Sequence, residues 1–129
     1  MHVSSCWIAE VLAAKMNAIL PEPWRITAVE GRLDLYCNDN LDSELYRLIS
    51  GNERELELDE LELRAVEILE NLQDTLSAAL TLPWPSVDGR AMALPAARTS
   101  EDALHLWFGT KEEDPVLAMT PILLKQVGE

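Results

Sequence analysis

The segment WRITAVEGRLDLYC, residues 24–37, alternates apolar and polar side chains on both sides of Glu30-Gly31. Glycine readily adopts the positive φ that a two-residue hairpin turn requires, so Glu30-Gly31 predicts such a turn. A shift of one residue would move every apolar side chain to the other face, so the pattern specifies the register. One face of the predicted hairpin carries the apolar pairs Ala28–Leu33, Ile26–Leu35 and Trp24–Cys37, and the other face is mostly polar.

The segment before this hairpin predicts a helix over about 5–20. Ser4 or Ser5 can cap it, because a serine hydroxyl accepts a hydrogen bond from an unpaired N–H of the first turn. Apolar side chains recur there on one broad face at helical spacing. The run Leu20-Pro21-Glu22-Pro23 ends the helix, because proline disfavours helical backbone in the residue before it.

A longer amphipathic helix is predicted over about 60–81. Asp59 is placed to cap its N-terminus, with Glu62 as the capping-box partner three residues later. Most apolar residues of this segment fall within an arc of about 120° at helical spacing. Leu63 and Val66 lie outside that stripe, so we expect them to be exposed or to contact a second surface.

Between the hairpin and the long helix, the sequence predicts a turn at 38–40 and a short helix over about 41–49. The residues 54–58 alternate strictly between polar and apolar types. This alternation fits a short strand, but the same residues could also begin the long helix.

After the long helix, residues 83–100 contain three prolines and are expected to form an irregular loop. A second hairpin is predicted over about 103–124, with Pro121 at a strand end or a sheet edge because it has no N–H to donate.

This element order predicts an α+β fold in a single domain, residues 1–129. We expect an antiparallel sheet of four or five strands, built from the hairpins over about 24–37 and 103–124. The long helix over about 60–81 and the N-terminal helix over about 5–20 pack against it.

The chain is strongly acidic, with 23 acidic and 10 basic residues in 129 and a formal charge of −13. This charge argues against binding to nucleic acids or anionic membranes, which are polyanions. Residues 41–82 alone carry a net charge of −8, whereas residues 83–100 carry +1. The excess of arginine over lysine, with many alanines and leucines, suggests a bacterial source with a GC-rich genome.

We expect a cytoplasmic protein, because the N-terminus lacks a signal-peptide pattern and no segment approaches the roughly 20 apolar residues that cross a bilayer. In that compartment Cys6 and Cys37 are expected to remain reduced, although they could pair.

The residues that enzymes use are sparse. His2 and His105 are the only histidines, and no Walker, GxGxxG or GxSxG motif is present. The acidic residues at the entry to the long helix could bind a hard metal ion, but a solvated acidic face explains them better; these are Glu55, Glu57, Asp59, Glu60 and Glu62. We therefore expect no catalytic residues, no metal and no cofactor.

The segment 83–100 is the candidate binding site for a partner, because it is the one stretch that is not acidic. It contains Trp84, Arg90, Met92 and Arg98, and these residue types are enriched at the centres of protein interfaces. The competing interpretation is that this segment closes over the sheet, with Trp84 filling the base of the core.

Two functions remain open at this point. The first is a non-enzymatic interaction protein, either an adaptor, an inhibitor or a small chaperone. The second is a binder of a small anionic ligand, or an enzyme acting on one, in which Arg90 or Arg98 grips the anion through its planar guanidinium.

In element order the chain resembles the type III secretion chaperones and related small acidic chaperone-like proteins. That order is helix, two strands, a third strand if residues 54–58 form one, long helix and two strands, and the short helix expected at 41–49 departs from it. The resemblance implies a homodimer that binds partner polypeptides, in which Leu63 and Val66 would be buried. No residue motif accompanies the resemblance, so it assigns no functional residues.

Overall fold

The structure is a computed structural model that describes residues 2–48, 55–87 and 91–124. Within these ranges the chain forms helices and antiparallel strands, which confirms the α+β class. The elements in chain order are β1 (His2–Ser4), α1 (Ser5–Asn17), β2 (Trp24–Val29), β3 (Arg32–Cys37), β4 (Asn40–Arg47), β5 (Glu55–Glu57), α2 (Leu58–Leu80), β6 (Ser86–Val87), β7 (Ala91–Met92), β8 (Pro95–Ser100), β9 (Ala103–Phe108), β10 (Leu117–Ala118) and β11 (Ile122–Leu123).

The hairpin of β2 and β3 has the predicted register along its whole length. Its turn residues Glu30 and Gly31 have φ angles of 49° and 81°, as a two-residue type I′ turn requires. Ile26, Leu33 and Leu35 are buried, so the face predicted to be apolar points into the core.

The short helix expected over about 41–49 is wrong, because residues 40–47 form β4, which pairs with β3. Two register shifts interrupt this pairing. Each β-bulge inserts an extra residue and breaks the period of two along a strand. The leucines at 41, 45 and 48 have a spacing that also fits one face of a helix, but in the structure Leu45 and Leu48 are buried whereas Leu41 is exposed.

The strand β9 is the centre of a second sheet. It pairs with β10 and β11, as the predicted hairpin over 103–124 requires, and Pro121 lies in the break between these two short strands. Residues 83–100 are not irregular throughout, because they contain β6, β7 and β8, and β8 pairs with the other side of β9. Pro95 is compatible with this strand because it is the first residue of an edge strand.

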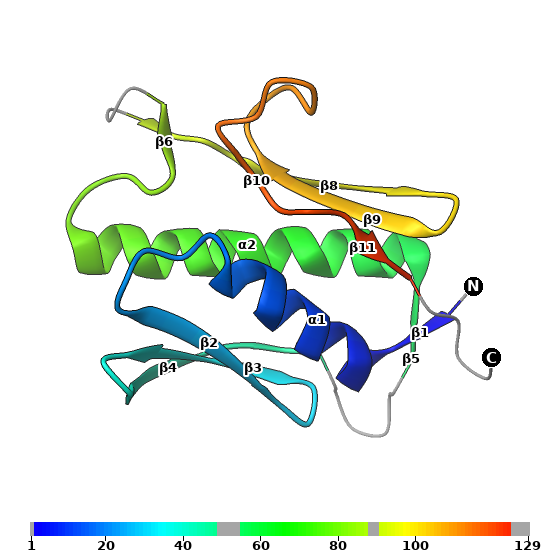
Figure 1. Cartoon of the computed structure of the whole chain (residues 1–129), viewed down its shortest axis with the longest axis horizontal. Helices are drawn as coiled ribbons and strands as arrows, with labels where there is room; N and C mark the ends of the chain where they lie inside the picture. The colour runs from blue at the N-terminus through cyan, green and yellow to red at the C-terminus, as the bar shows by residue number, and fades with distance from the viewer. Residues whose placement is uncertain (1, 49–54, 88–90, 125–129) are drawn as a thin grey trace.

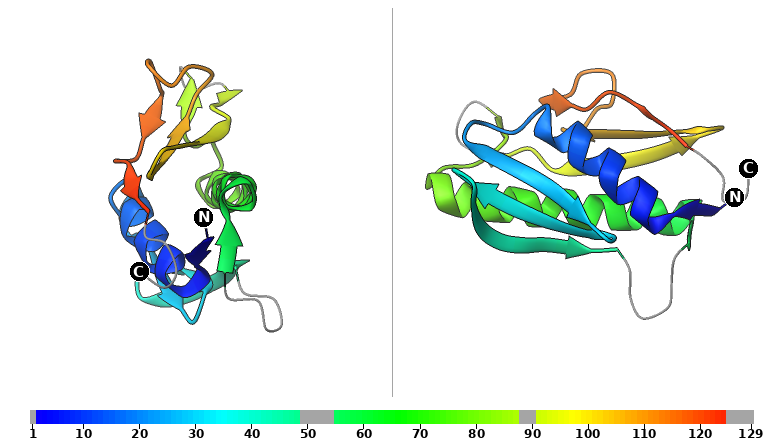
Figure 2. Two further views of the ribbon diagram at one scale, coloured as in Figure 1. Left: turned by 90° about the vertical axis from the view of Figure 1, so that its right-hand side faces the viewer. Right: turned by 60° about the horizontal axis from the view of Figure 1, so that its bottom comes forward.

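The two predicted hairpins thus belong to separate sheets. Among the described residues, β2, β3 and β4 form a three-stranded sheet, and β8, β9, β10 and β11 form a four-stranded one. The helix α2 runs between the sheets, and α1 lies against β2 and β3 (Figures 1 and 2). The hydrophobic core takes side chains from both helices and both sheets, for example Leu12, Leu35, Leu69 and Phe108.

Both helices are found, with ends that differ from the predicted ones. Ser4 caps α1 by accepting a hydrogen bond of 3.3 Å from the Trp7 N–H, and α1 ends at Asn17 rather than near residue 20. The long helix begins at Leu58 with Glu57 as its N-cap residue, whose side chain makes no capping hydrogen bond, so the predicted capping box is wrong. Asp59 lies inside the helix and accepts a hydrogen bond of 2.9 Å from the Glu60 N–H. Glu62 instead accepts hydrogen bonds from Thr99 on β8.

Polar side chains of the helices bond to the outer edges of three strands. The Asn17 amide exchanges two hydrogen bonds, of 2.7 and 2.9 Å, with the backbone of Ile26 on β2. Asn71 donates to the Leu45 carbonyl on β4 at 3.1 Å. Together with the bonds from Thr99 of β8 to Glu62, these bonds satisfy backbone groups at strand edges that would otherwise remain open to another strand.

The choice left open for residues 54–58 is settled for the described part of that segment. Glu55–Glu57 is the strand β5, which pairs with β1, and the helix starts immediately after it. The cross-strand partners His2 and Glu57 also approach through their side chains, with 3.3 Å between Nε2 and Oε1.

Candidate interaction surface

The C-terminal end of α2 positions the segment in which a partner site is predicted. Thr81 follows the last helical residue with a φ of 56°, and this left-handed backbone ends the helix. The N–H groups of Thr81 and Leu82 both donate to the Ser77 carbonyl. The chain therefore turns back along α2 from residue 82 onward.

Ser77 brings together two of the predicted site residues, Trp84 and Met92. Its Oγ accepts a hydrogen bond of 2.9 Å from the Trp84 N–H. The same oxygen lies 3.2 Å from the Met92 Sδ. One hydroxyl on α2 thus fixes both ends of the segment that contains β6 and β7.

Trp84 also packs toward the core, as the competing interpretation expected. Its ring meets Phe108 edge to face, with 5.8 Å between centroids and an interplanar angle of 66°. Nearby, the buried Gln73 amide donates to the Ala93 carbonyl. Trp84 is half-buried, so part of its surface remains accessible.

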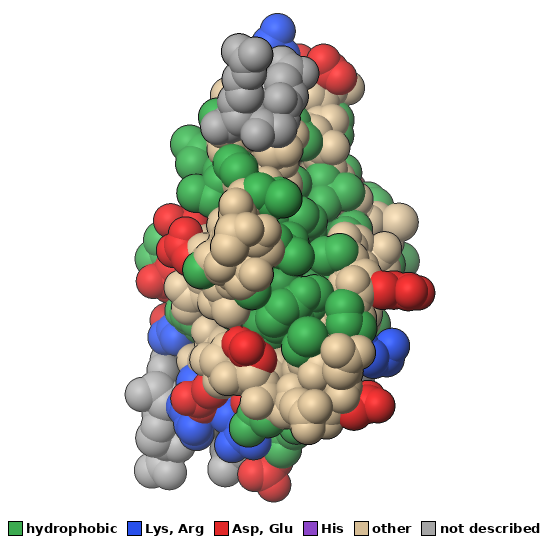
Figure 3. Space-filling view, turned by 90° about the vertical axis from the view of Figure 1, so that its left-hand side faces the viewer, with side chains coloured by type: hydrophobic (Ala, Val, Ile, Leu, Met, Phe, Trp, Pro, Cys, Tyr) green, Lys and Arg blue, Asp and Glu red, His purple; other side chains and the backbone are tan. Residues whose placement is uncertain are grey.

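The neighbours of Trp84 are exposed apolar side chains. Leu82 is 54 % exposed, Met92 is 40 % exposed and Leu94 is 68 % exposed. We call these three residues together with Trp84 the apolar end. Figure 3 shows a band of hydrophobic side chains across this side of the molecule. Contiguous exposed apolar surface of this kind is typical of an interaction site.

The apolar end continues onto the four-stranded sheet through Gly109. The Gly109 N–H donates to the Leu94 carbonyl at 2.9 Å, and a Cβ on Gly109 would lie 3.2 Å from the Val116 nitrogen. Gly109 has a φ of +137°, which residues with a side chain rarely adopt. The backbone of this glycine therefore lies between two exposed apolar residues, Leu94 and Val116.

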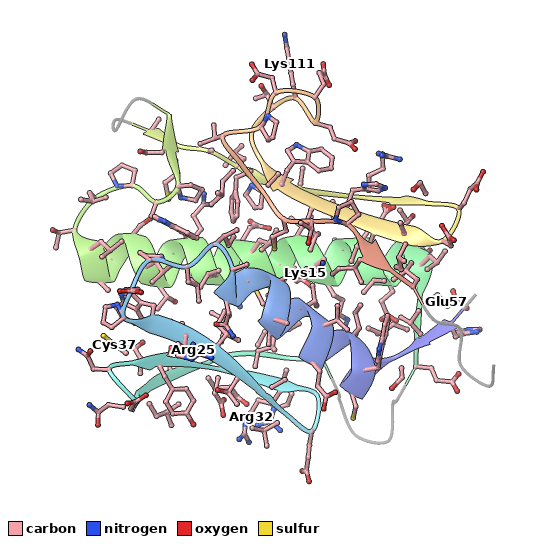
Figure 4. The ribbon with its side chains drawn as sticks, in the orientation of Figure 1. Lys15, Arg25, Arg32, Cys37, Glu57 and Lys111 are labelled. Atoms are coloured by element: carbon pink, nitrogen blue, oxygen red, sulfur yellow. The ribbon has the colours of Figure 1, made fainter. Side chains whose placement is uncertain are left out.

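A hollow of about 430 Å³ opens at the same end of the molecule, where β2 begins and β3 ends. Figure 4 shows Arg25 and Cys37 at this end of the three-stranded sheet. The hollow combines apolar walls with polar and charged groups, and it is lined by Asn17, Leu20, Glu22, Pro23, Trp24, Arg25, Asn38 and Asp39.

Arg98, the third predicted site residue that the structure describes, is held by Glu112. Its Nε and one terminal nitrogen lie 2.6 and 2.7 Å from the two carboxylate oxygens. These hydrogen bonds raise the pKa of Arg98 and hold the pKa of Glu112 below its usual value. The guanidinium that an anionic ligand would need is therefore already paired. Arg90 lies outside the described residues.

Next to this ion pair, His105 is bonded to Ser100, with 2.9 Å between Nε2 and Oγ. Glu112 lies 4.0 Å from Nδ1, which is longer than a hydrogen bond. The three side chains are arranged in the order that serine hydrolases use, but Arg98 binds the carboxylate that would orient the histidine. These contacts join the strands β8 and β9 to the loop that contains Glu112.

Across the ranges 2–48, 55–87 and 91–124, no cluster of three or more His, Cys, Asp or Glu side chains is placed to hold a metal ion. Nor does any helix in these ranges combine the length and the apolar character that crossing a membrane requires.

The apolar end contains Trp84 and Met92, which the sequence predicted as site residues, and Leu82 and Leu94, which it did not. Both leucines immediately precede a proline, in Leu82-Pro83 and Leu94-Pro95. Neither belongs to a helical or alternating pattern, so their exposure has no local signal.

Comparison with models of known protein families, with curated proteins and with solved structures finds no match to this chain.

Proposed function

We propose that the protein is a non-enzymatic interaction module that binds an apolar segment of a partner polypeptide at the apolar end. The observation that carries this proposal is the exposure of Leu82, Met92 and Leu94 beside the anchored ring of Trp84. Removing such side chains from water is the main favourable term in protein association. An aromatic anchor surrounded by aliphatic side chains is also a common hot-spot arrangement.

The element order supports the same function. When strands of two or three residues are left aside, the order is α1, the strands β2, β3 and β4, then α2 and the strands β8 and β9. The resemblance to type III secretion chaperones, which bind partner polypeptides, counted residues 54–58 as the third strand, and β4 is a longer third strand before α2. Cys6 and Cys37 are unpaired, which suits the reducing cytoplasm in which we propose that the protein works.

Two alternatives are less favourable, namely the binding of a small anionic ligand and homodimerisation. A small anionic ligand at Arg98 would have to displace Glu112 from a two-point ion pair. A homodimer through the apolar end would bring together two copies that each carry a charge of −13. A neutral partner polypeptide meets neither obstacle.

Binding of neutral peptides rich in leucine and phenylalanine, followed by fluorescence anisotropy, tests the proposal. We expect the Leu94→Glu variant to bind at least about tenfold more weakly, since a carboxylate would be desolvated in the contact. Leu123→Glu is the matched control, because Leu123 is 72 % exposed on β11, away from the apolar end. Equal binding by both variants, or no binding by the unmodified protein, would contradict the proposal.

A further inference from the structure

A second exposed apolar feature lies on the first half of α2. Leu63 is 64 % exposed, and two hollows meet at it and at Asp59. We call the two hollows together the Leu63 groove. One hollow has a volume of about 630 Å³ and is also lined by His2, Glu55, Glu57 and Glu60. The other has a volume of about 270 Å³ and is also lined by Glu62, Val66 and Ala97.

The edge of β8 opens into this groove at Ala97. Because the Gly109 N–H bonds to the Leu94 carbonyl, Leu94 and Gly109 form a hydrogen-bonded pair. Along an antiparallel strand, residues whose N–H and carbonyl point toward the partner strand alternate with residues whose N–H and carbonyl point away from it. The backbone hydrogen-bonding groups therefore point away from β9 at Pro95, Ala97 and Thr99. Pro95 has no N–H, and the Thr99 N–H is bonded to Glu62 at 2.7 Å. Among the described residues, Ala97 is thus the position of β8 at which an outward N–H and carbonyl stand open.

The negative charge around the groove favours a positively charged binding partner. Its walls carry the carboxylates of Glu55, Glu57, Asp59, Glu60 and Glu62. Among the described residues, Arg64 pairs with Glu60 at 3.3 Å, Arg98 interacts electrostatically with Glu62, and the His2 ring approaches Glu57. A second copy of this acidic chain would be repelled, whereas lysine or arginine side chains would be attracted.

We propose that the Leu63 groove binds a basic segment of a polypeptide in an extended conformation. One backbone unit of the segment pairs with Ala97, in the manner of strand addition to a sheet edge. An apolar side chain of the segment covers Leu63 and Val66, and its lysine or arginine side chains face the carboxylates. The carboxylates alone would be a solvated face, and it is the open edge position beside an exposed leucine that marks a docking groove. The lining of the groove shares no residue with the apolar end.

The probe is a fluorescein-labelled peptide of ten residues in which lysine and leucine alternate, with anisotropy as the readout. We expect binding that weakens when ionic strength rises from about 0.05 M to about 0.3 M, because salt screens charge pairs. Leu63→Ser and Asp59→Asn should each weaken binding about tenfold. The Leu94→Glu variant should bind this peptide as the unmodified protein does, which separates the proposal from the apolar end.

The backbone contact has its own test. Ala97→Pro removes the outward N–H and, like Pro95 two residues earlier, leaves the pairing with β9 intact. We expect about tenfold weaker binding with an unchanged circular dichroism spectrum. If this variant unfolds, a lysine–leucine peptide that is N-methylated at alternate residues replaces it, and that peptide should bind as weakly. Binding of a glutamate–leucine peptide with equal affinity, or undiminished binding by Leu63→Ser, would overturn the proposal.

Discussion

Glu62 is the side chain through which we expect α2 and β8 to stabilise each other. One of its carboxylate oxygens accepts hydrogen bonds of 2.7 Å from the Thr99 N–H and 2.5 Å from the Thr99 Oγ1. A hydrogen bond to a charged group contributes about 1.5–3 kcal/mol when it is well buried. Because Glu62 and Thr99 are half-buried and share one oxygen, we expect Glu62→Ala to cost about 2 kcal/mol in total.

Urea unfolding followed by circular dichroism measures this loss directly. In a thermal scan, a loss of about 2 kcal/mol should lower Tm by roughly 6–10 °C for a chain of this length. Glu70→Ala is the matched control, because Glu70 is an exposed residue of the same helix, and it should change stability by less than about 0.5 kcal/mol.

A double-mutant cycle with Thr99→Val separates two explanations of the same loss. If Glu62 acts through Thr99, the two substitutions should couple by about 1 kcal/mol. If Glu62 acts instead as a helix-capping residue, as its sequence position suggests, the effects should simply add. Additive effects, or equal stability of Glu62→Ala and Glu70→Ala, would refute the contact between α2 and β8.

Three further outcomes are expected from stability measurements. Trp84→Ala should lower the free energy of unfolding by about 2–3 kcal/mol in urea titrations, since the half-buried ring loses its contact with Phe108. Leu63→Ser should change it by less than about 0.5 kcal/mol, because Leu63 is exposed. The stability difference between the unmodified protein and Glu112→Gln should depend on pH. Arg98 lowers the folded-state pKa of Glu112 below 4.5, so the difference should be constant above about pH 5 and disappear as the pH falls through that lowered pKa. A difference that persists at about pH 2 would contradict the ion pair.

The parts of the fold that could be predicted are those in which the signal is local. The register of β2 and β3 follows from one turn and one alternating pattern, both contained in residues 24–37. The buried stripe of α2 likewise repeats at a single period over many turns.

The missed elements depend on partners far along the chain. The leucines at 41, 45 and 48 have a helical spacing, and only pairing with β3 reveals the strand β4. The prolines of residues 83–100 suggested a loop. Pro95 is nevertheless compatible with the strand β8, because it stands at a sheet edge where no hydrogen bond is lost. Glu62 bonds to Thr99, 37 positions later, and no local pattern announces that contact.

For the candidate site, composition identified the segment but not its geometry. Trp84 and Met92 were predicted because their residue types are common in interfaces, and both contact Ser77 in the structure. Arg98 was grouped with them by the same argument from residue type. Its partner Glu112 belongs to the loop after β9, so the ion pair could not be read from residues 83–100.

The most direct test of the central claim is a map of amide chemical shifts on binding a neutral apolar peptide. The residues that contact the partner should show the largest changes in amide chemical shift. We predict that the largest shifts fall at Leu82, Met92 and Leu94, with the indole N–H of Trp84 shifting as well. Shifts concentrated on any other surface, with these residues unchanged at saturation, would contradict the assignment of the apolar end as the interaction site.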